Sequence, residues 1–322
     1  DRATIDAQPT RARAPTQWDG PSLGGLLATA AGGPWRHAYG PLRDWVLGMR
    51  VIGADGRVTK AGGRVVKNVA GYDLCRLYVG SLGTLGIIVE ATLRLAPLPK
   101  ARRTTAVALP SVQQGMAMAR RLQDGPLRLR SLELVNRPAA EAMGLSLPLP
   151  ESGLLLLEAA GEEAAVARSS QELSAILGDF PDARVVADDG GDDLWTSLRG
   201  LLGQGGLRVQ AGVRPSRVAE ILEAWQKLGG ESTTVVAQPT VGIVHCAWPA
   251  AGLERDLDLV LALRQEASRL GGSLTVEACS RDLKERIDVW GETGTGFPLM
   301  ARIKARFDPQ GILNPGRFVG RL

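Results

Sequence analysis

Short apolar runs alternate with glycine-rich turns over the first third of the chain. Two of these runs, Leu47–Ile52 and Arg57–Thr59, flank the dipeptide Asp55-Gly56, and an Asp-Gly turn between β-like segments predicts a hairpin. The β-branched run Ile87-Ile88-Val89 predicts a buried strand. Two prolines then interrupt the pattern, and since proline blocks further strand pairing we expect a domain boundary near Lys100.

Beyond this boundary, apolar residues follow the spacing of strands and of amphipathic helices in turn. Two successive sets are predicted, each in the order strand, helix, strand, strand, helix, strand, which is the order of a ferredoxin-like α+β layer. The first set comprises Thr104–Leu109, Val112–Leu122, Leu132–Val135, Leu154–Leu157, Ala164–Leu177 and Ala183–Ala187. The second set comprises Leu207–Gln210, Val218–Trp225, Val235–Ala237, Gly242–Ala247, Leu253–Leu270 and Ser273–Ala278.

The end of the chain is predicted to return to the glycine-rich part. Pro298–Phe307 has helical spacing, and the proline after Asp308 ends that helix. Its expected inward positions are Leu299, Ile303 and Phe307. The expected fold class is therefore α+β, divided into an irregular segment 1–18, a glycine-rich domain 19–100, an α+β cap domain 101–296 and a returning segment 297–322.

The composition adds little to this picture but excludes several classes of protein. The net charge is +4 over 322 residues, and no Lys/Arg run is interleaved with aromatic side chains, so no nucleic-acid partner is expected. The three cysteines, Cys75, Cys246 and Cys279, include no closely spaced pair, which argues against a disulfide framework and a zinc site. No window approaches about 18 apolar residues, so no membrane span is predicted and a cytoplasmic location is expected.

Three glycines at intervals of three, Gly80, Gly83 and Gly86, come directly before the strand predicted at Ile87. Glycine accepts a positive φ and lets the backbone approach a bulky group closely. Backbone N–H groups of such a turn commonly hold the phosphates or the sugar of a nucleotide. By itself this spacing favours a structural turn, and the segments around it shift the balance towards a binding turn.

Four segments in order along the chain resemble the FAD-binding fold of the vanillyl-alcohol-oxidase superfamily, also called the PCMH type. They are Ser22–Gly33, Tyr39–Gly48, Lys67–Leu74 and Phe307–Phe318, of which Lys67–Leu74 is the most diagnostic. Within that superfamily the sequence is most similar to the flavin-binding E subunits of bacterial glycolate oxidases. The resemblance implies an FAD cofactor bound by a PCMH-type domain, and a ferredoxin-like cap domain inserted before the C-terminal segment.

The resemblance also implies an N-terminal subdomain that this sequence does not match. Members of the superfamily carry it before the segment equivalent to Ser22–Gly33, and it includes the glycine-rich loop that holds the FAD pyrophosphate. Here the sequence begins with Asp1, and residues 1–18 have no apolar periodicity. We therefore expect the second FAD-binding subdomain to be present and the first to be missing, which would weaken the affinity for FAD.

The residues expected to contact FAD come from the matched segments. Main chain at Gly24, Gly25 and Gly32 would lie against the flavin ring and its ribityl chain, and Thr29 would offer its hydroxyl group. The alternative is a tight turn of small residues packed on a helix. The expected cofactor residues are Gly24, Gly25, Thr29, Gly32, Gly33, Gly40, Ser81, Gly83, Gly86, Ile87 and Asn314.

The sequence offers no complete set of catalytic groups. A flavin-dependent oxidation of a 2-hydroxy acid needs a base for the hydroxyl proton and a cation or metal for the carboxylate. His37 lies near the segment expected to face the flavin and is the catalytic candidate, whereas His245 stands in an apolar strand and is expected to be a core residue. The histidine-rich metal motif of catalytic members of the superfamily is absent, so no metal site is expected.

These expectations lead to one hypothesis and two alternatives. The chain is expected to be an FAD-binding subunit of a glycolate oxidase, relaying electrons or acting as a scaffold while glycolate is oxidised to glyoxylate. The resemblance implies a catalytic flavoprotein D subunit and an iron–sulfur F subunit as partners, which could hold the complex at the inner membrane. The alternatives are a self-sufficient FAD-dependent 2-hydroxy-acid dehydrogenase of the D-lactate type, and a structural subunit that no longer binds flavin.

Overall fold

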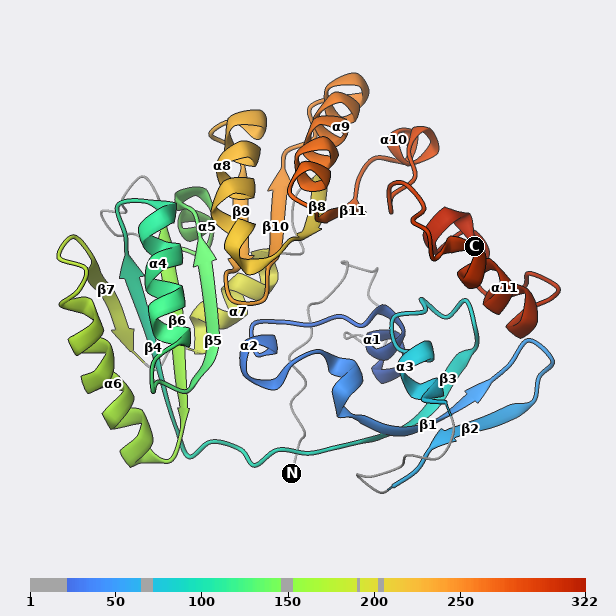
Figure 1. Ribbon diagram of the computed structural model, residues 1–322, viewed down its shortest axis with the longest axis horizontal. Coiled ribbons are helices and arrows are strands. Elements are labelled where there is room, and N and C mark those ends of the chain that lie inside the picture. The colour runs from blue at the N-terminus through green and yellow to red at the C-terminus, as the bar shows by residue number, and fades with distance from the viewer. Residues whose placement is uncertain (1–21, 65–71, 146–152, 190–191, 202–205) are drawn as a thin grey trace. The chain divides into compact units, whose positions relative to one another are not determined.

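The computed structural model describes residues 22–64, 72–145, 153–189, 192–201 and 206–322, which Figure 1 draws as a coloured ribbon. The chain forms two compact units, each assembled from segments that are far apart in the sequence. The predicted segment 1–18 and most of the motif Lys67–Leu74 lie outside the described residues. Unit 1 takes the described parts of Asp1–Gly33, Gly40–Pro97 and Glu292–Leu322, and unit 2 those of Pro34–Tyr39 and Leu98–Gly291.

Unit 1 contains, among the described residues, a three-stranded antiparallel sheet in the order β2-β1-β3. Its strands are β1 (Val46–Ile52), β2 (Val58–Gly62) and β3 (Ile87–Leu93). Its helical elements are α1 (Leu23–Thr29), the 3₁₀ turn η1 (Leu42–Trp45), α3 (Leu74–Tyr78), α11 (Phe297–Phe307) and the 3₁₀ turn η3 (Val319–Arg321). The hairpin predicted at Asp55-Gly56 is confirmed, since β1 pairs with β2 and Gly56 has a φ of 75°.

One hydrophobic cluster packs the elements of unit 1 against one face of this sheet. Met49 and Val51 of β1 are buried in it together with Leu27 of α1 and Tyr78 of α3. Phe307 of α11 meets Tyr78 edge to face, with the ring centroids 5.9 Å apart. The C-terminal helix therefore packs with segments from the first third of the chain.

Two details of the predicted packing are wrong. Ile303 and Phe307 pack against the cluster, but Leu299 is 59% exposed because the first turn of α11 extends past the packed residues. The strand predicted at Ile87-Ile88-Val89 forms, yet Ile87 and Val89 are 55% and 52% exposed. Periodicity identifies a face of an element, but it does not say how far the core beneath that face extends.

Unit 2 contains, within the described ranges, an eight-stranded antiparallel sheet in the order β11-β8-β10-β9-β5-β6-β4-β7. Its strands are β4 (Ala101–Ala108), β5 (Leu129–Val135), β6 (Leu154–Gly161), β7 (Arg184–Asp189), β8 (Leu207–Gly212), β9 (Thr234–Gln238), β10 (Ile243–Trp248) and β11 (Ser273–Ala278). Its helical elements are α2 (Arg36–Tyr39), α4 (Val112–Gln123), α5 (Arg137–Ala142), α6 (Glu163–Leu177), α7 (Asp192–Leu201), the 3₁₀ turn η2 (Pro215–Arg217), α8 (Val218–Gly229), α9 (Leu253–Arg269) and α10 (Arg281–Arg286).

The sheet of unit 2 consists of two ferredoxin-like layers joined edge to edge. The elements β4-α4-β5-β6-α6-β7 form the first layer, with strand order β5-β6-β4-β7, and β8-α8-β9-β10-α9-β11 form the second, with order β9-β10-β8-β11. The two orders are equivalent, so the predicted pair of sets is confirmed. The layers meet where β5 pairs with β9, at Leu134↔Ala237 and Val135↔Val236.

The two faces of this sheet are covered differently. The helices α4, α6, α8 and α9 pack on one face (Figure 1), over an apolar cluster that includes Trp225 and Leu263. The helices α5 and α7 cover part of the opposite face with residues such as Ala139 and Trp195. The sequence patterns did not predict these two helices. The same opposite face also carries buried polar side chains, among them Arg208 and His245.

Candidate functional site

The glycine turn, residues 80–86, is held against the end of α1 by backbone hydrogen bonds. The Gly80 N–H donates to Leu27 O at 3.0 Å, and the Leu82 N–H donates to Ala28 O at 2.7 Å. Gly80 and Leu82 have φ values of 83° and 55°, a left-handed conformation that glycine adopts without strain. Gly80 meets this requirement, whereas Leu82 adopts the same region with a side chain, and the two backbone bonds keep the end of α1 and the turn close together.

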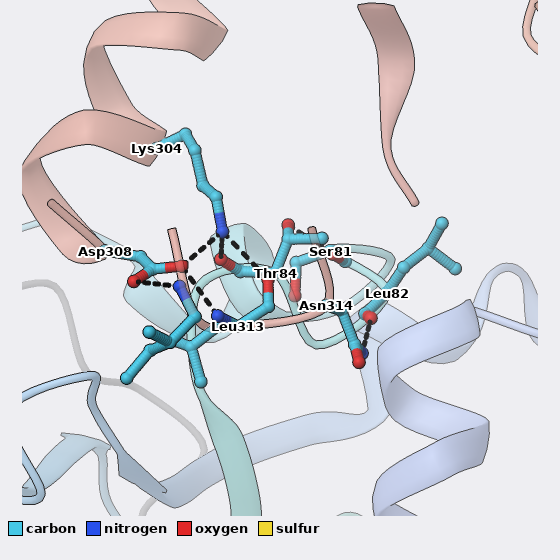
Figure 2. Close-up of polar contacts among 8 residues, drawn as sticks. Ser81, Leu82, Thr84, Lys304, Asp308, Leu313 and Asn314 are labelled. Carbon is cyan, nitrogen blue, oxygen red and sulfur yellow. Dashed lines mark hydrogen bonds and ion pairs between the residues drawn. The ribbon is translucent and has the colours of Figure 1, made fainter. Parts of the chain in front are cut away.

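A second turn, residues 313–316, approaches the glycine turn from the C-terminal segment, as Figure 2 shows. Asn314 has a φ of 42°, and its Nδ2 donates to Leu82 O at 2.7 Å. A Cβ atom at Gly83 would lie 2.8 Å from the same Nδ2, so only glycine permits this approach. We call these residues the Asn314 turn.

Lys304 of α11 contacts both turns with one ammonium group (Figure 2). Its Nζ donates to Thr84 O and Leu313 O, each at 2.9 Å, and to Asp308 Oδ2 at 2.5 Å. The Asp308 side chain has no exposed surface, and it also accepts the N–H groups of Ile312 at 3.0 Å and Leu313 at 2.8 Å. Burial raises the pKa of Asp308, but Lys304 and these N–H groups outweigh burial and hold the pKa below its usual range.

All the residues predicted to contact FAD lie in unit 1, but several have packing roles of their own. A Cβ at Gly24 would lie 2.9 Å from Ile88 O, and one at Gly86 would lie 2.3 Å from Val51 Cγ1. The Thr29 hydroxyl donates to the carbonyl of α1 four residues earlier, at 2.8 Å, which leaves its oxygen free to accept. These contacts show that the glycine pattern carries structural constraints whether or not a ligand is bound.

The glycine turn also has the features of a backbone binding site. The N–H groups of Gly83 and Leu85 donate to no acceptor within the part of the chain that the structure describes. Such donors match the carbonyl and hydroxyl oxygens of a flavin and its ribityl chain, and Gly83, at a φ of 72°, has no side chain that would obstruct a ligand. The residues present therefore fit FAD.

His37, the catalytic candidate, belongs to unit 2, whereas the predicted cofactor residues belong to unit 1. Its Nδ1 and the Thr240 hydroxyl oxygen are 2.7 Å apart, and burial lowers its pKa. Nearby, the Arg130 guanidinium stacks over the ring of Trp35, 4.4 Å from its centroid, and donates through Nε to Glu158 at 2.6 Å. These contacts fasten the segment around His37 to the polar face of the unit 2 sheet.

A small pocket lies on that polar face, where β8, β10 and β11 are neighbours. His245 Nδ1 lies 3.5 Å from Glu277 Oε2. Burial raises the pKa of Glu277, but His245 and Arg208 outweigh it and lower the pKa. Arg208 is 8% exposed, and its Nε has no hydrogen-bond partner among the described residues. The lining residues are Leu201, Arg208, Thr234, Val236, His245, Cys246, Ala247 and Glu277.

The side chains of this pocket follow from strand alternation. Val209 and Val244 point into the apolar cluster under the helices, so their neighbours Arg208 and His245 point to the opposite face. His245 is buried, as expected of a core histidine. Unlike a histidine enclosed in an apolar core, however, His245 lines a pocket and lies beside the carboxylate of Glu277.

Sequence reasoning missed Arg208, Glu277, Lys304 and Asp308. A signal existed for the last two, since positions four apart at the end of a helix share a face. Arg208 and Glu277 each interrupt an apolar strand pattern, which marks a polar face. Neither signal says which strands or turns become neighbours in the folded chain.

The described residues offer neither a cluster of metal-binding side chains nor a membrane-spanning helix. No three His, Cys, Asp or Glu side chains in that part of the chain are grouped so that they could hold a metal ion. No helix there is both long enough and apolar enough to cross a membrane.

Comparisons with known proteins match most of the chain. Residues 98–318 match the model for FAD linked oxidases, C-terminal domain, and residues 11–62 match an FAD binding domain. The D-lactate dehydrogenase of Archaeoglobus fulgidus is 30% identical over 325 residues, covering 94% of this chain and 70% of that protein. Glycolate oxidase subunit GlcD of Bacillus subtilis is 26% identical, covering 93% of this chain and 68% of that protein.

The similarity to an E-type subunit is closer but shorter. Glycolate oxidase subunit GlcE of Escherichia coli is 41% identical over 109 residues, which cover 34% of this chain and 31% of that protein. Among solved structures, alkyldihydroxyacetonephosphate synthase has a TM-score of 0.66 at 16% identity, covering 93% of this chain and 59% of that chain. This chain therefore spans only part of each of these proteins, and the likeness to the solved structure concerns the fold alone.

Proposed function

Because this chain belongs to the family of FAD-linked oxidases, we propose that it is an FAD-binding chain of an oxidoreductase that acts on a small 2-hydroxy acid, such as glycolate or D-lactate. The observation that carries the proposal is the similarity to a D-lactate dehydrogenase over 94% of the chain. When bound, FAD supplies the chemistry of hydride acceptance, and the protein's own residues bind and orient both ligands.

On the cofactor side, the glycine turn and the Asn314 turn are the proposed binding elements. The unpaired N–H groups of Gly83 and Leu85, within the described residues, supply donors for the polar atoms of the cofactor. The α1 end contributes small residues against which a flat ring can lie. The full proposed set is Gly24, Gly25, Thr29, Gly32, Gly33, Gly40, Ser81, Gly83, Gly86, Ile87 and Asn314.

On the substrate side, the polar groups that line the pocket in unit 2 match the chemistry of a 2-hydroxy carboxylate. The Arg208 guanidinium would hold the carboxylate group. His245 would accept the hydroxyl proton, and the ionised Glu277 at 3.5 Å would stabilise the protonated imidazole. His37 is less well supported as the base, because its Nδ1 is engaged with the Thr240 hydroxyl.

Two divisions of labour fit this proposal. In the first, the chain is the E-type subunit of a glycolate oxidase complex, with a catalytic flavoprotein D subunit and an iron–sulfur F subunit as partners in the cytoplasm or at the inner membrane. The 41% identity to an E subunit supports it. In the second, the chain oxidises its substrate alone, which is supported by its longer similarity to a D-lactate dehydrogenase and to a D subunit.

Anaerobic single-turnover absorbance distinguishes these cases. The FAD-loaded chain is mixed with glycolate or D-lactate, with and without the D and F subunits, and loss of the oxidised flavin band is followed. Bleaching by the chain alone at about 1–1000 per second supports a self-sufficient dehydrogenase. Bleaching only in the presence of the partners supports the subunit role. A chain that stays colourless after incubation with FAD and desalting contradicts the proposal and leaves a structural subunit.

A further inference from the structure

We propose that Lys304 is a positioning residue for FAD, and that the Lys304–Asp308 pair acts as a latch between the glycine turn and the Asn314 turn. The inference rests on the proposed function in one respect, namely that these two turns hold the cofactor. Neither residue was among the expected cofactor contacts, and the role proposed here requires no direct contact with the ligand.

The latch joins three separate stretches of backbone at one nitrogen atom. Lys304 Nζ donates to Thr84 O in the glycine turn, to Leu313 O in the Asn314 turn and to Asp308 Oδ2 at the end of its own helix. Figure 2 shows these bonds converging on the ammonium group. An ammonium group has three N–H donors, so all of them are used within the protein. Lys304 therefore cannot donate to a ligand without breaking one of these bonds.

Burial makes the latch rigid. The side chains of Lys304 and Asp308 are 11% and 0% exposed, so water is poorly placed to replace a lost partner. Removing one charge from a buried pair leaves the other unbalanced at high cost. Asp308 also accepts the N–H groups of Ile312 and Leu313, which ties the start of the Asn314 turn to the same pair.

The effect on the cofactor follows from the planarity of the peptide bond. The carbonyl of Thr84 and the N–H of Leu85 belong to one peptide plane and point in opposite directions. Lys304 holds that carbonyl at 2.9 Å, so it also fixes the direction of the Leu85 N–H, which has no acceptor in the described part of the chain. The Thr84 hydroxyl donates to Ser81 O at 2.7 Å and closes the turn from the other side. Lys304 thus aims one of the donors that the proposed site offers to FAD.

The test measures the FAD dissociation constant by quenching of flavin fluorescence in the full chain. Lys304→Met keeps the length of the side chain and removes the ammonium group, and we expect it to raise the dissociation constant about tenfold, the change that corresponds to the loss of one well-oriented hydrogen bond to the ligand. Arg302→Met is the matched control, since Arg302 is an exposed residue of the same helix. It should stay within about twofold of wild type.

Two further variants distinguish a purely structural role of Lys304 from a role in positioning FAD. If Lys304→Met alone fails to fold because Asp308 is left as an unbalanced buried charge, adding Asp308→Asn removes that charge and should restore the fold. FAD binding by this double variant should remain weak, because the ammonium group is still missing. Asn314→Ala removes the bond to Leu82 O. If the latch and Asn314 act on the same turn, the losses of affinity in Lys304→Met and Asn314→Ala are less than additive when combined.

The outcomes separate the latch from the proposed function. A folded Lys304→Met protein, or the double variant, that binds FAD within about twofold of wild type overturns the latch while leaving FAD binding intact. The latch is also contradicted if the losses of FAD affinity caused by Lys304→Met and Asn314→Ala are additive in the combined variant. If wild type itself fails to bind FAD, the proposed function fails, and the positioning role fails with it.

Discussion

Asp308 and Glu277 are carboxylates whose behaviour is decided by their neighbours. In both residues burial alone would raise the pKa, and neighbouring groups reverse the direction: Lys304 and backbone N–H groups for Asp308, and His245 with Arg208 for Glu277. Each carboxylate is therefore ionised near neutral pH. At the residue scale, charge pairing keeps a buried carboxylate ionised in each of the two units.

Asp308→Asn is expected to lower the free energy of unfolding at neutral pH by about 3 kcal/mol, because it leaves the buried Lys304 ammonium without a carboxylate. The folded-state pKa of Asp308 lies below the unfolded-state value of about 3.9. Its contribution is therefore complete above that value and is lost as the pH falls through the folded-state pKa. Urea unfolding at about pH 7 and about pH 3 should show the difference from wild type narrowing in acid.

A variant of an exposed carboxyl, Asp124→Asn, controls for the loss of one negative charge, since the Asp124 side chain is 70% exposed. It should change stability by no more than about 0.5 kcal/mol. A difference between wild type and Asp308→Asn that is equally large at both pH values would contradict the assigned role of Lys304.

Arg208→Leu is expected to weaken binding of glycolate or D-lactate by about tenfold to a hundredfold, the usual effect of losing a charge-assisted hydrogen bond. The substitution removes the buried guanidinium of the pocket and leaves unit 1 unchanged. Calorimetric titration of the carboxylate measures the affinity, and the FAD dissociation constant serves as the internal control. Unchanged carboxylate binding would place the substrate elsewhere.

The glycine turn shows how one spacing can serve different purposes at the scale of an element. Gly80 has a φ of 83°, and Gly83 has a φ of 72° and faces Asn314. Gly86 has no positive φ, and its missing side chain instead leaves room for Val51 of β1. Two glycines thus permit the turn, and the third packs it onto the sheet.

Gly86→Ala is expected to destabilise the protein by about 1–3 kcal/mol through overpacking, because a Cβ there would lie 2.3 Å from Val51 Cγ1. Gly294→Ala is the control, since nothing lies within 4 Å of a Cβ at that position. Chemical unfolding followed by circular dichroism compares the two. Equal stability of both variants would show that the turn is not packed against β1 as described.

At the scale of the whole molecule, unit 2 depends on a short junction between its two layers. Asn136, which follows β5, donates through Nδ2 to Thr233 O at 2.6 Å and accepts the Val235 N–H at 3.0 Å. The same Oδ1 caps α5 by accepting the Ala139 N–H at 3.1 Å. One buried amide therefore links the first layer to the strand β9 of the second.

Asn136→Ala is expected to cost about 3 kcal/mol, since it removes a helix cap and leaves buried groups of β9 unsatisfied. Ser111→Ala is the matched control, because Ser111 caps α4 within one layer through the Gln114 N–H and should cost about 1 kcal/mol. If the junction couples the layers, Asn136→Ala breaks two-state unfolding and lowers the slope of the unfolding free energy against denaturant concentration, whereas Ser111→Ala leaves that slope unchanged. Similar effects of both substitutions would mean that Asn136 acts as a cap alone.

The sequence by itself determined the type and order of the elements. The two strand–helix–strand–strand–helix–strand sets and the hairpin at Asp55-Gly56 form as their patterns predict. The reason is physical: side-chain periodicity and turn chemistry depend on residues a few positions apart, and each segment carries that information itself. The order of the elements also determined the strand order of each layer, because the ferredoxin-like topology follows from it.

Only the tertiary structure decided which polar groups meet. Lys304 reaches Thr84, and Arg208, His245 and Glu277 share one pocket, although these residues come from different helices, turns and strands. It also placed His37 in unit 2. These contacts depend on long-range strand pairing and on the burial of charges beside specific partners. Local periodicity carries no information about either, because it records which face of a segment is buried and not what lies against that face.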